Sequence, residues 1–168
     1  EQVADDVSVL RLMPRHGVNA YLLGDVLVDA GYVGNGKGIV AALRRRDLQA
    51  HALTHGHPDH AGGSAHVTTE LGLELWCPAG DVEAVEAGRS VAKLPVPGPF
   101  VKFPPCKVSR PLREGDEVAG FKVLEVPGHS PGHIAFWRES DGVLVAGDVF
   151  FNLSMATLRY GLRHPLGV

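Results

Sequence analysis

The sequence lacks several features that would assign it to a specialised class of protein. Its two cysteines, Cys77 and Cys106, are too few for a disulfide scaffold and do not have the spacing of a zinc finger. There is no run of about 18 apolar residues, so no membrane-spanning helix is predicted. The first nine residues are acidic and lack the basic and apolar parts of a signal peptide. We expect packed thiols and a soluble protein in the cytoplasm.

Strong charge of either sign is also missing. The formal net charge is -3 and the isoelectric point is near 6.3, so long-range attraction to nucleic acid is not expected. The dense basic run, Arg44 to Arg46, is typical of the solvated end of a helix. We expect a small-molecule partner, with no nucleic acid and no membrane, and the sequence leaves the oligomeric state open.

The composition is that of a folded chain, with 45% hydrophobic and 21% charged residues over 168 positions. Short apolar runs predict strands at residues 7–13, 18–23, 26–29, 48–53 and 73–77. Helical spacing predicts helices around 39–43 and over 64–71 and 81–87, with Ser64 and Asp81 as N-caps of the last two. The first three strands are expected to form an antiparallel opening sheet.

The second half begins with a proline-rich stretch. Six of the 12 prolines lie within residues 95–111, which predicts a long loop or a sheet edge. It could be a lid carrying Phe100 and Phe103, or only a stiff connection. Further strands are predicted at 117–126, 133–138 and 142–149. Strands and helices from both halves indicate a layered α/β sandwich in one domain.

The densest chemical signal follows the strand at 48–53. The segment Thr54 to Gly63 places three of the nine histidines and one carboxylate within six residues. His55 and His57 are spaced to point the same way, and the turn at Pro58 moves Asp59 and His60 to a neighbouring position. Imidazole and carboxylate ligands suit zinc, and also iron or manganese. Two metal positions could therefore share one loop.

This segment resembles the His-x-His-x-Asp-His signature of the metallo-β-lactamase superfamily. Residues 19–23 and 26–31 look like the opening strands of that family, and its supporting Asp corresponds to Asp29. Residues 126–133 and 146–148 resemble its third and fourth motifs. The resemblance implies an αββα sandwich of two mixed sheets. It also implies that residues 1–168 form a metallo-β-lactamase-like domain without the usual last strand and helix.

Carried over residue by residue, the resemblance implies one or two bound metal ions, most often zinc. The implied ligands are His55, His57 and His129 for a first ion, Asp59 and His60 for a second, and Asp148 as a bridge between both. Asp59 would also orient a hydroxide or move a proton, as the catalytic residue. His133 is expected to hydrogen-bond within the turn beside His129, and His16, His51 and His66 are expected to be ordinary surface or packed residues.

The implied function is a metal-dependent hydrolase that uses a metal-bound hydroxide on a thioester or a lactone. The bridging Asp148 disfavours antibiotic hydrolysis. The absence of a Gly-Arg-x-Asp-like stretch in residues 150–160 disfavours a glutathione thioester. Two alternatives stay open: a mononuclear iron persulfide dioxygenase, and a degenerate non-catalytic domain that serves in metal binding or assembly.

The family pattern ends with one more histidine on a late strand. After Asp148 the sequence offers only His164, 16 residues on and without an apolar strand before it. The expectation is therefore a chain that is incomplete at its C-terminal end. A second metal position lacking that ligand is expected to bind its ion more weakly than the first.

Overall fold

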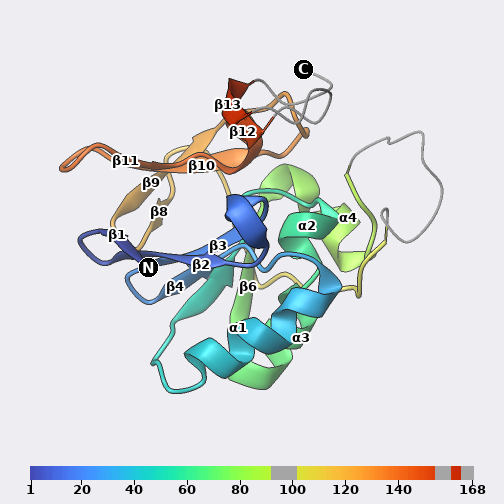
Figure 1. Ribbon diagram of the computed structural model, residues 1–168. Helices are drawn as coiled ribbons and strands as arrows, with labels where there is room; N and C mark the ends of the chain where they lie inside the picture. The colour runs from blue at the N-terminus through green and yellow to red at the C-terminus, as the bar shows by residue number, and fades with distance from the viewer. Residues whose placement is uncertain (92–101, 154–159, 164–168) are drawn as a thin grey trace.

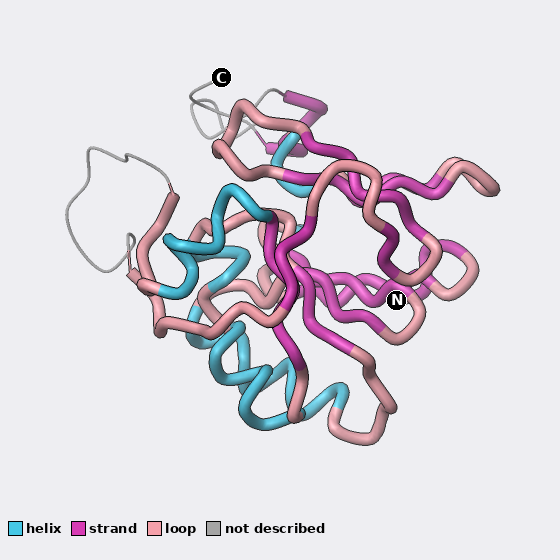
Figure 2. Tube along the Cα trace, turned by 180° about the vertical axis from the view of Figure 1, so that it is seen from behind, coloured by secondary structure: helices cyan, strands magenta, loops and turns pink. Residues whose placement is uncertain are grey.

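The protein consists of two stacked β-sheets with helices on the outer side of the first sheet (Figure 1). The structure is a computed structural model that describes residues 1–91, 102–153 and 160–163. Figure 2 shows, from behind, that the helices gather on one side of the strands. The described residues thus supply three layers of the expected αββα sandwich: helices, first sheet and second sheet.

The first sheet has seven strands in the order β1 to β7. Strands β1 to β4 pair antiparallel, whereas β4 to β7 pair parallel, so the sheet is mixed and its opening is antiparallel as predicted. Its strands are β1 (Gln2–Ala4), β2 (Val7–Arg11), β3 (Asn19–Leu23), β4 (Val26–Val28), β5 (Ala50–Ala52), β6 (Glu74–Pro78) and β7 (Arg110–Leu112). The sequence did not predict β1.

The second sheet has the strand order β11-β10-β9-β8, and its described strands all pair antiparallel rather than in a mixed pattern. They are β8 (Glu117–Val118), β9 (Phe121–Glu125), β10 (Ile134–Arg138) and β11 (Val143–Val145). A single strand over 117–126 was wrong, because Ala119 and Gly120 adopt positive φ angles of 48° and 78° and turn the chain. A strand continuing to 149 was also wrong. The strands β12 (Phe151–Leu153) and β13 (Tyr160–Arg163) form a separate pair.

Four α-helices are described: α1 (Gly36–Leu43), α2 (Pro58–Ala61), α3 (Ser64–Leu71) and α4 (Val82–Glu86). Four 3-10 turns accompany them: η1 (Pro14–His16), η2 (Val33–Asn35), η3 (Ala79–Asp81) and η5 (Gly147–Val149). The sequence predicted α1, α3 and α4, but it treated α2 as a turn. In the described part of the chain, no helix has both the length and the apolar character needed to cross a bilayer.

The proposed N-cap of α3 was wrong, because its cap residue is Gly63 and Ser64 is its first residue. Asp81 does hold the N-cap position of α4, as predicted, but neither helix has a side-chain hydrogen bond at its cap. Ser64 and Asp81 are both fully buried, and each side chain bonds to a different element of the fold. Polar side chains in the interior satisfy whichever group is within reach, and a local cap is only one such group.

Buried side chains fill both faces of the first sheet. Val26 and Val28 on β4 pack toward the second sheet with Phe121 and Phe136, whereas Leu27 packs toward α1 and α3. Because both faces are covered, these strands are continuous apolar runs rather than alternating ones. A third cluster lies under α2 and α4 and contains the two free, buried thiols, Cys77 and Cys106, as expected.

The proline-rich stretch includes the edge strand β7, in which Pro111 pairs with Cys77 on β6. Proline is tolerated at an edge because it has no N–H to donate to a further strand. Phe103 is buried in the third cluster, so it packs into the core and is not part of a lid. Phe100 lies outside the described residues.

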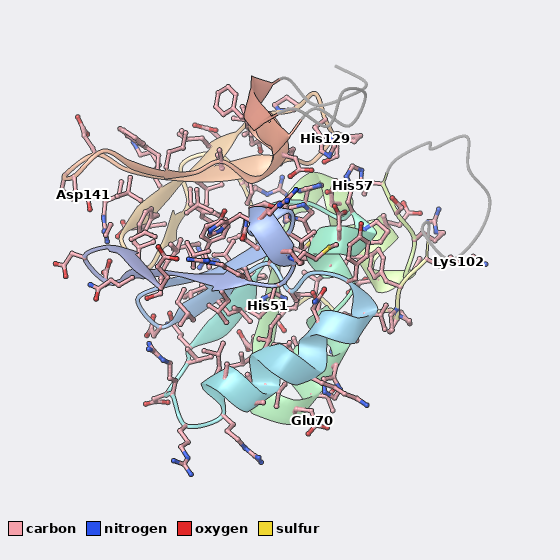
Figure 3. The ribbon with its side chains drawn as sticks, viewed as in Figure 1. His51, His57, Glu70, Lys102, His129 and Asp141 are labelled. Atoms are coloured by element: carbon pink, nitrogen blue, oxygen red, sulfur yellow. The ribbon has the colours of Figure 1, made fainter. Side chains whose placement is uncertain are left out.

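His51 ties β5 to its neighbours below the ligand-rich loop (Figure 3). Its Nδ1–H donates to the Leu27 carbonyl at 3.1 Å, so the neutral ring accepts the Ser64 hydroxyl at Nε2, 2.8 Å away. The residue is fully buried, and burial lowers the pKa of His51 to about 4. His51 is therefore a packed, neutral histidine, as the sequence analysis expected.

This lowered pKa predicts a loss of stability in acid. The unfolded chain binds the His51 proton with an ordinary pKa of 6.5, so the free energy of unfolding falls as the pH drops from about 6.5 to about 4. In the presence of a chelator, His51→Asn should lose roughly 3 kcal/mol less than wild type between pH 7 and pH 4. Urea unfolding at a series of pH values measures this difference, and parallel curves for the two proteins would contradict it.

Candidate metal centre

The chemically active side chains lie where the strands of both sheets end. Asp29 follows β4, residues 54–60 follow β5, and both segments are at the carboxyl edge of the parallel strands. From the second sheet, His129 comes from the β9–β10 connection and Asp148 from η5 after β11. Figure 3 shows His57 and His129 close together between the two sheets. The site therefore forms only when the sheets stack.

Three imidazole nitrogens and one carboxylate oxygen converge at its centre. His57 Nδ1 lies 2.9 Å from His55 Nε2 and 2.8 Å from His129 Nε2. The Asp148 Oδ2 atom is 3.2 Å from His129 Nε2 and 3.9 Å from His55 Nε2. These residues form a group whose ligand atoms all lie within 4.8 Å of one another.

Hydrogen bonds alone do not account well for this convergence. The Nδ1 atom of a neutral histidine carries either one proton or one lone pair in the ring plane, so it cannot make two directed bonds at once. His57 Nδ1 nevertheless faces two other ring nitrogens at hydrogen-bond distance. A cation placed among them would accept a lone pair from each ring. The donor set fits a metal ion.

A second group adjoins the first. His60 Nε2 lies 3.2 Å from Asp148 Oδ1 and 3.9 Å from Asp59 Oδ2, and these three residues meet the same spatial criterion. Asp148 thus directs one oxygen to each group. Two adjacent groups of possible ligands thus lie where the His-x-His-x-Asp-His spacing led us to expect two metal positions, and α2 separates Asp59 and His60 from the first pair.

Asp29 organises both groups from below. Its buried carboxylate accepts hydrogen bonds from the Thr54 N–H at 2.8 Å, the Thr54 hydroxyl at 2.8 Å and His60 Nδ1 at 2.7 Å. Because the Thr54 hydroxyl donates its hydrogen bond to Asp29, its oxygen accepts one from His55 Nδ1 at 3.0 Å. Both rings are therefore held with Nε2 directed into the site. The expected support of the ligand loop by Asp29 is confirmed.

The protonation states differ between the two groups. Burial lowers the pKa of His57 to about 3, and it lowers the pKa of His55 well below its usual value, so both rings are neutral at pH 7. Burial also disfavours charge on His60, but the Asp29 and Asp148 carboxylates outweigh it and raise the pKa of His60 well above its usual value. Without a metal ion, His60 holds a proton that a cation would have to displace.

Close backbone approaches keep these loops in place. Asp29 itself has a positive φ of 60°, a strained conformation for a residue other than glycine. A Cβ on Gly63 would lie 2.4 Å from the Ala30 carbonyl oxygen, and one on Gly62 would lie 2.3 Å from that of Pro58. Any side chain at these two glycines would therefore collide with the backbone of the neighbouring segment.

His133 connects the two motifs of the second sheet. Its main-chain N–H donates to the Ser130 carbonyl within the turn, at 3.4 Å, but its ring bonds elsewhere. His133 Nε2 accepts the N–H of Asp148 at 3.2 Å, and a Cβ on Gly147 would lie 2.5 Å from that nitrogen. This support of Asp148 and the role of Thr54 were not predicted from the sequence, because no spacing signal distinguishes either residue.

All six residues predicted as metal ligands fall within the two groups. They are His55, His57, Asp59, His60, His129 and Asp148. Among the described residues, His16, His51 and His66 lie outside both groups, in accordance with their expected roles. His164 and most of the segment 150–160 lie outside the described residues or have no described side chains.

Comparison with known proteins points to one family. The model of the metallo-β-lactamase superfamily matches residues 13–167. A hydroxyacylglutathione hydrolase of Bdellovibrio bacteriovorus is 32% identical over 142 residues, covering 81% of this chain and 47% of that protein. One from Alkalilimnicola ehrlichii is 39% identical over 126 residues, covering 70% and 40%. The chain therefore spans about half the length of these curated relatives, or less.

The fold has solved counterparts as well. A metallo-β-lactamase from Novosphingobium pentaromativorans superposes with a TM-score of 0.62 at 28% identity, covering 76% of this chain and 53% of that one. The matches to solved structures and to curated sequences agree on the architecture. The matched curated sequences are named hydroxyacylglutathione hydrolases, whereas the matched solved structure is named a metallo-β-lactamase.

The Asp29 network predicts a stability effect that does not depend on metal. In Asp29→Asn, the NH₂ group of the amide would face one of the three hydrogen-bond donors that now bond to the carboxylate, and two donors cannot bond to each other. We expect the free energy of unfolding to fall by about 3 kcal/mol, the order of magnitude for a buried charge-assisted network that loses an acceptor. Urea unfolding with a chelator present measures it. Asp47→Asn, at an exposed position, is the matched control, and equal effects of both substitutions would argue against the network.

Proposed function

This chain belongs to the metallo-β-lactamase superfamily, and from that premise we propose that it is a metal-dependent hydrolase of a small ester-like substrate, a thioester or a lactone. The observation that carries the proposal is the convergence of three imidazole nitrogens on one point beside the Asp148 carboxylate. Such a set of neutral nitrogens and one carboxylate oxygen is what a divalent cation requires of a protein.

We assign His55, His57 and His129 to a first metal position and Asp59 and His60 to a second, with Asp148 contributing to both. Zinc is the proposed metal, and iron or manganese would accept the same ligands. The first position is expected to be the tighter one. Its His55 and His57 rings are neutral at pH 7, whereas a cation at the second must displace the proton of His60 and finds three ligands among the described residues.

A divalent cation held here would supply hydroxide at neutral pH, because it lowers the pKa of water from about 16 to about 7. The chain's own residues complete the chemistry. The Asp59 side chain is 32% exposed, and it is the carboxylate of the site with the greatest access to solvent and substrate. Its proposed role is to orient the attacking water and afterwards to move its proton. The His133 ring accepts the main-chain N–H of Asp148, and the Asp148 carboxylate directs one oxygen to each group.

Two observations bear on the substrate class. Relatives at 32% and 39% identity are named hydroxyacylglutathione hydrolases, and this favours an acyl thioester over a β-lactam. The sequence of residues 150–160 lacks a stretch typical of glutathione thioesterases, so a thioester without glutathione, or a lactone, remains in the proposal.

Metal content and a substrate panel test the proposal together. Purified protein should contain zinc and hydrolyse a glutathione thioester, a simple acyl thioester or a lactone. A β-lactam, a phosphodiester and a sulfate ester serve as comparisons. One bound iron with oxygen consumption would instead identify a persulfide dioxygenase. Full metal loading without turnover on any substrate would favour a binding or assembly domain.

The first metal position should depend on His57, which faces both other histidines. His57→Ala is expected to weaken metal binding there by about two orders of magnitude or more, because one of three neutral ligands is removed. Competition with a colorimetric chelator gives the affinity. His66→Ala, a histidine outside both groups, is the control. Unchanged metal content and activity in His57→Ala would refute the assignment.

Asp59→Asn should separate catalysis from folding. We expect turnover to fall by about 10²- to 10⁴-fold, the usual share of a positioned acid–base group, and affinity at the second position to fall as well. The free energy of unfolding should change by less than about 1 kcal/mol, because the side chain is partly exposed and serves the site rather than the core. Asp25→Asn, on the surface, is the control. Full activity with both metals retained would exclude both roles.

A further inference from the structure

Asp81 is a fully buried carboxylate that belongs to neither group of possible metal ligands. It follows β6, at the end of η3, on the same carboxyl edge of the first sheet as Asp29 and the histidine loop. Its Oδ2 accepts the N–H of Gly56 at 2.7 Å. Gly56 is the residue between His55 and His57, so this bond holds the centre of the first ligand loop.

The other oxygen of Asp81 faces the loop that carries His129. A Cβ on Gly132 would lie 2.2 Å from Asp81 Oδ1, which shows how closely that loop approaches the carboxylate. Gly80 also lies close to this loop, because a Cβ there would be 3.0 Å from the Gly132 Cα. Ser130, next to His129 in the same loop, is also buried.

The two loops come from different sheets, and 72 residues separate His57 from His129. At their base they are joined by the Ile134 N–H, which donates to the Thr54 carbonyl at 3.0 Å. Behind the ligands, Asp81 bonds to the first loop through Oδ2 and lies against the second through Oδ1. A buried carboxylate is costly to retain, so its presence between two ligand loops calls for a compensating role.

We infer that Asp81 is a positioning residue for the three-histidine metal position, an inference that rests on the proposed function. It holds the His55–His57 loop and the His129 loop at the separation at which their ring nitrogens converge. Loss of this tie affects the position that draws ligands from both loops. Asp59 and His60 share the short helix α2, and His60 is held by Asp29, so the second position depends on Asp81 much less.

Selectivity distinguishes this role from ordinary core packing. A residue that only stabilises the fold would weaken both metal positions together, or neither. Each position can be titrated alone with Co²⁺ and Zn²⁺: the first in an Asp59→Ala background and the second in a His57→Ala background. The absorption spectrum of bound Co²⁺ reports the ligand geometry without any need for activity.

In the Asp59→Ala background, Asp81→Ala should weaken the three-histidine position by about 10- to 100-fold, the usual effect of losing a partner that orients metal ligands, and should change the cobalt spectrum. In the His57→Ala background the affinity should stay within about threefold. Asp116→Asn is the matched control, since Asp116 also accepts a main-chain N–H, that of Arg113, in a turn of the second half of the chain.

Asp81→Asn provides a second, milder variant that keeps the fold testable if Asp81→Ala does not fold. Its amide oxygen can still accept from Gly56, but its NH₂ group faces the Gly132 loop, so an intermediate loss of affinity is expected. Unchanged affinity and spectrum in the folded variants, or equal weakening of both positions, would overturn the inference alone. Absence of any metal binding by the otherwise wild-type protein would overturn the proposed function, and the inference with it.

Discussion

The buried carboxylate of Asp29 is the interaction on which the rest of the site depends. It is 1% exposed, and it adopts a strained backbone conformation with φ of 60°. Three hydrogen bonds offset the cost of burying its charge, and each reaches the loop that carries the ligand residues. Through Thr54 it orients His55, and directly it orients His60. One side chain thus orients one possible metal ligand in each of the two groups.

The parallel strands of the first sheet place the other parts around this centre. The chain leaves β4, β5 and β6 at the same edge, delivering Asp29, the histidine loop and Asp81 in turn. In sheets of this kind, ligand sites form outside the carboxyl ends of the strands. The second sheet adds His129 and Asp148 only because its inner face packs against the first through residues such as Phe121 and Phe136.

Crowding of imidazoles makes the centre electrostatically unbalanced when no cation is bound. The ring of His55 has the rings of His57, His60, His129 and His133 at centroid distances of 4.5, 4.1, 5.0 and 4.8 Å. Such rings cannot all be protonated, and burial keeps His55 and His57 neutral. Holding the nitrogen lone pairs of these neutral rings close together is electrostatically unfavourable, and packing elsewhere in the fold must offset this free-energy cost. Metal affinity and fold stability are therefore expected to be coupled.

The amino-acid sequence by itself determined the α/β class and most strands and helices, because apolar periodicity is a local property of the chain. The six residues of the candidate metal centre were predicted through the resemblance to a known family: four lie in the His-x-His-x-Asp-His segment, and His129 and Asp148 lie in its third and fourth motifs. The break at Ala119 and Gly120, the packing of Phe103 and the tasks of Ser64, Thr54, Asp81 and His133 were decided only by the tertiary structure. Each depends on a partner far away in the chain or on a backbone angle that residue type leaves open. A buried polar side chain bonds to whatever group the stacked sheets bring within reach, and spacing along the sequence carries no record of that group.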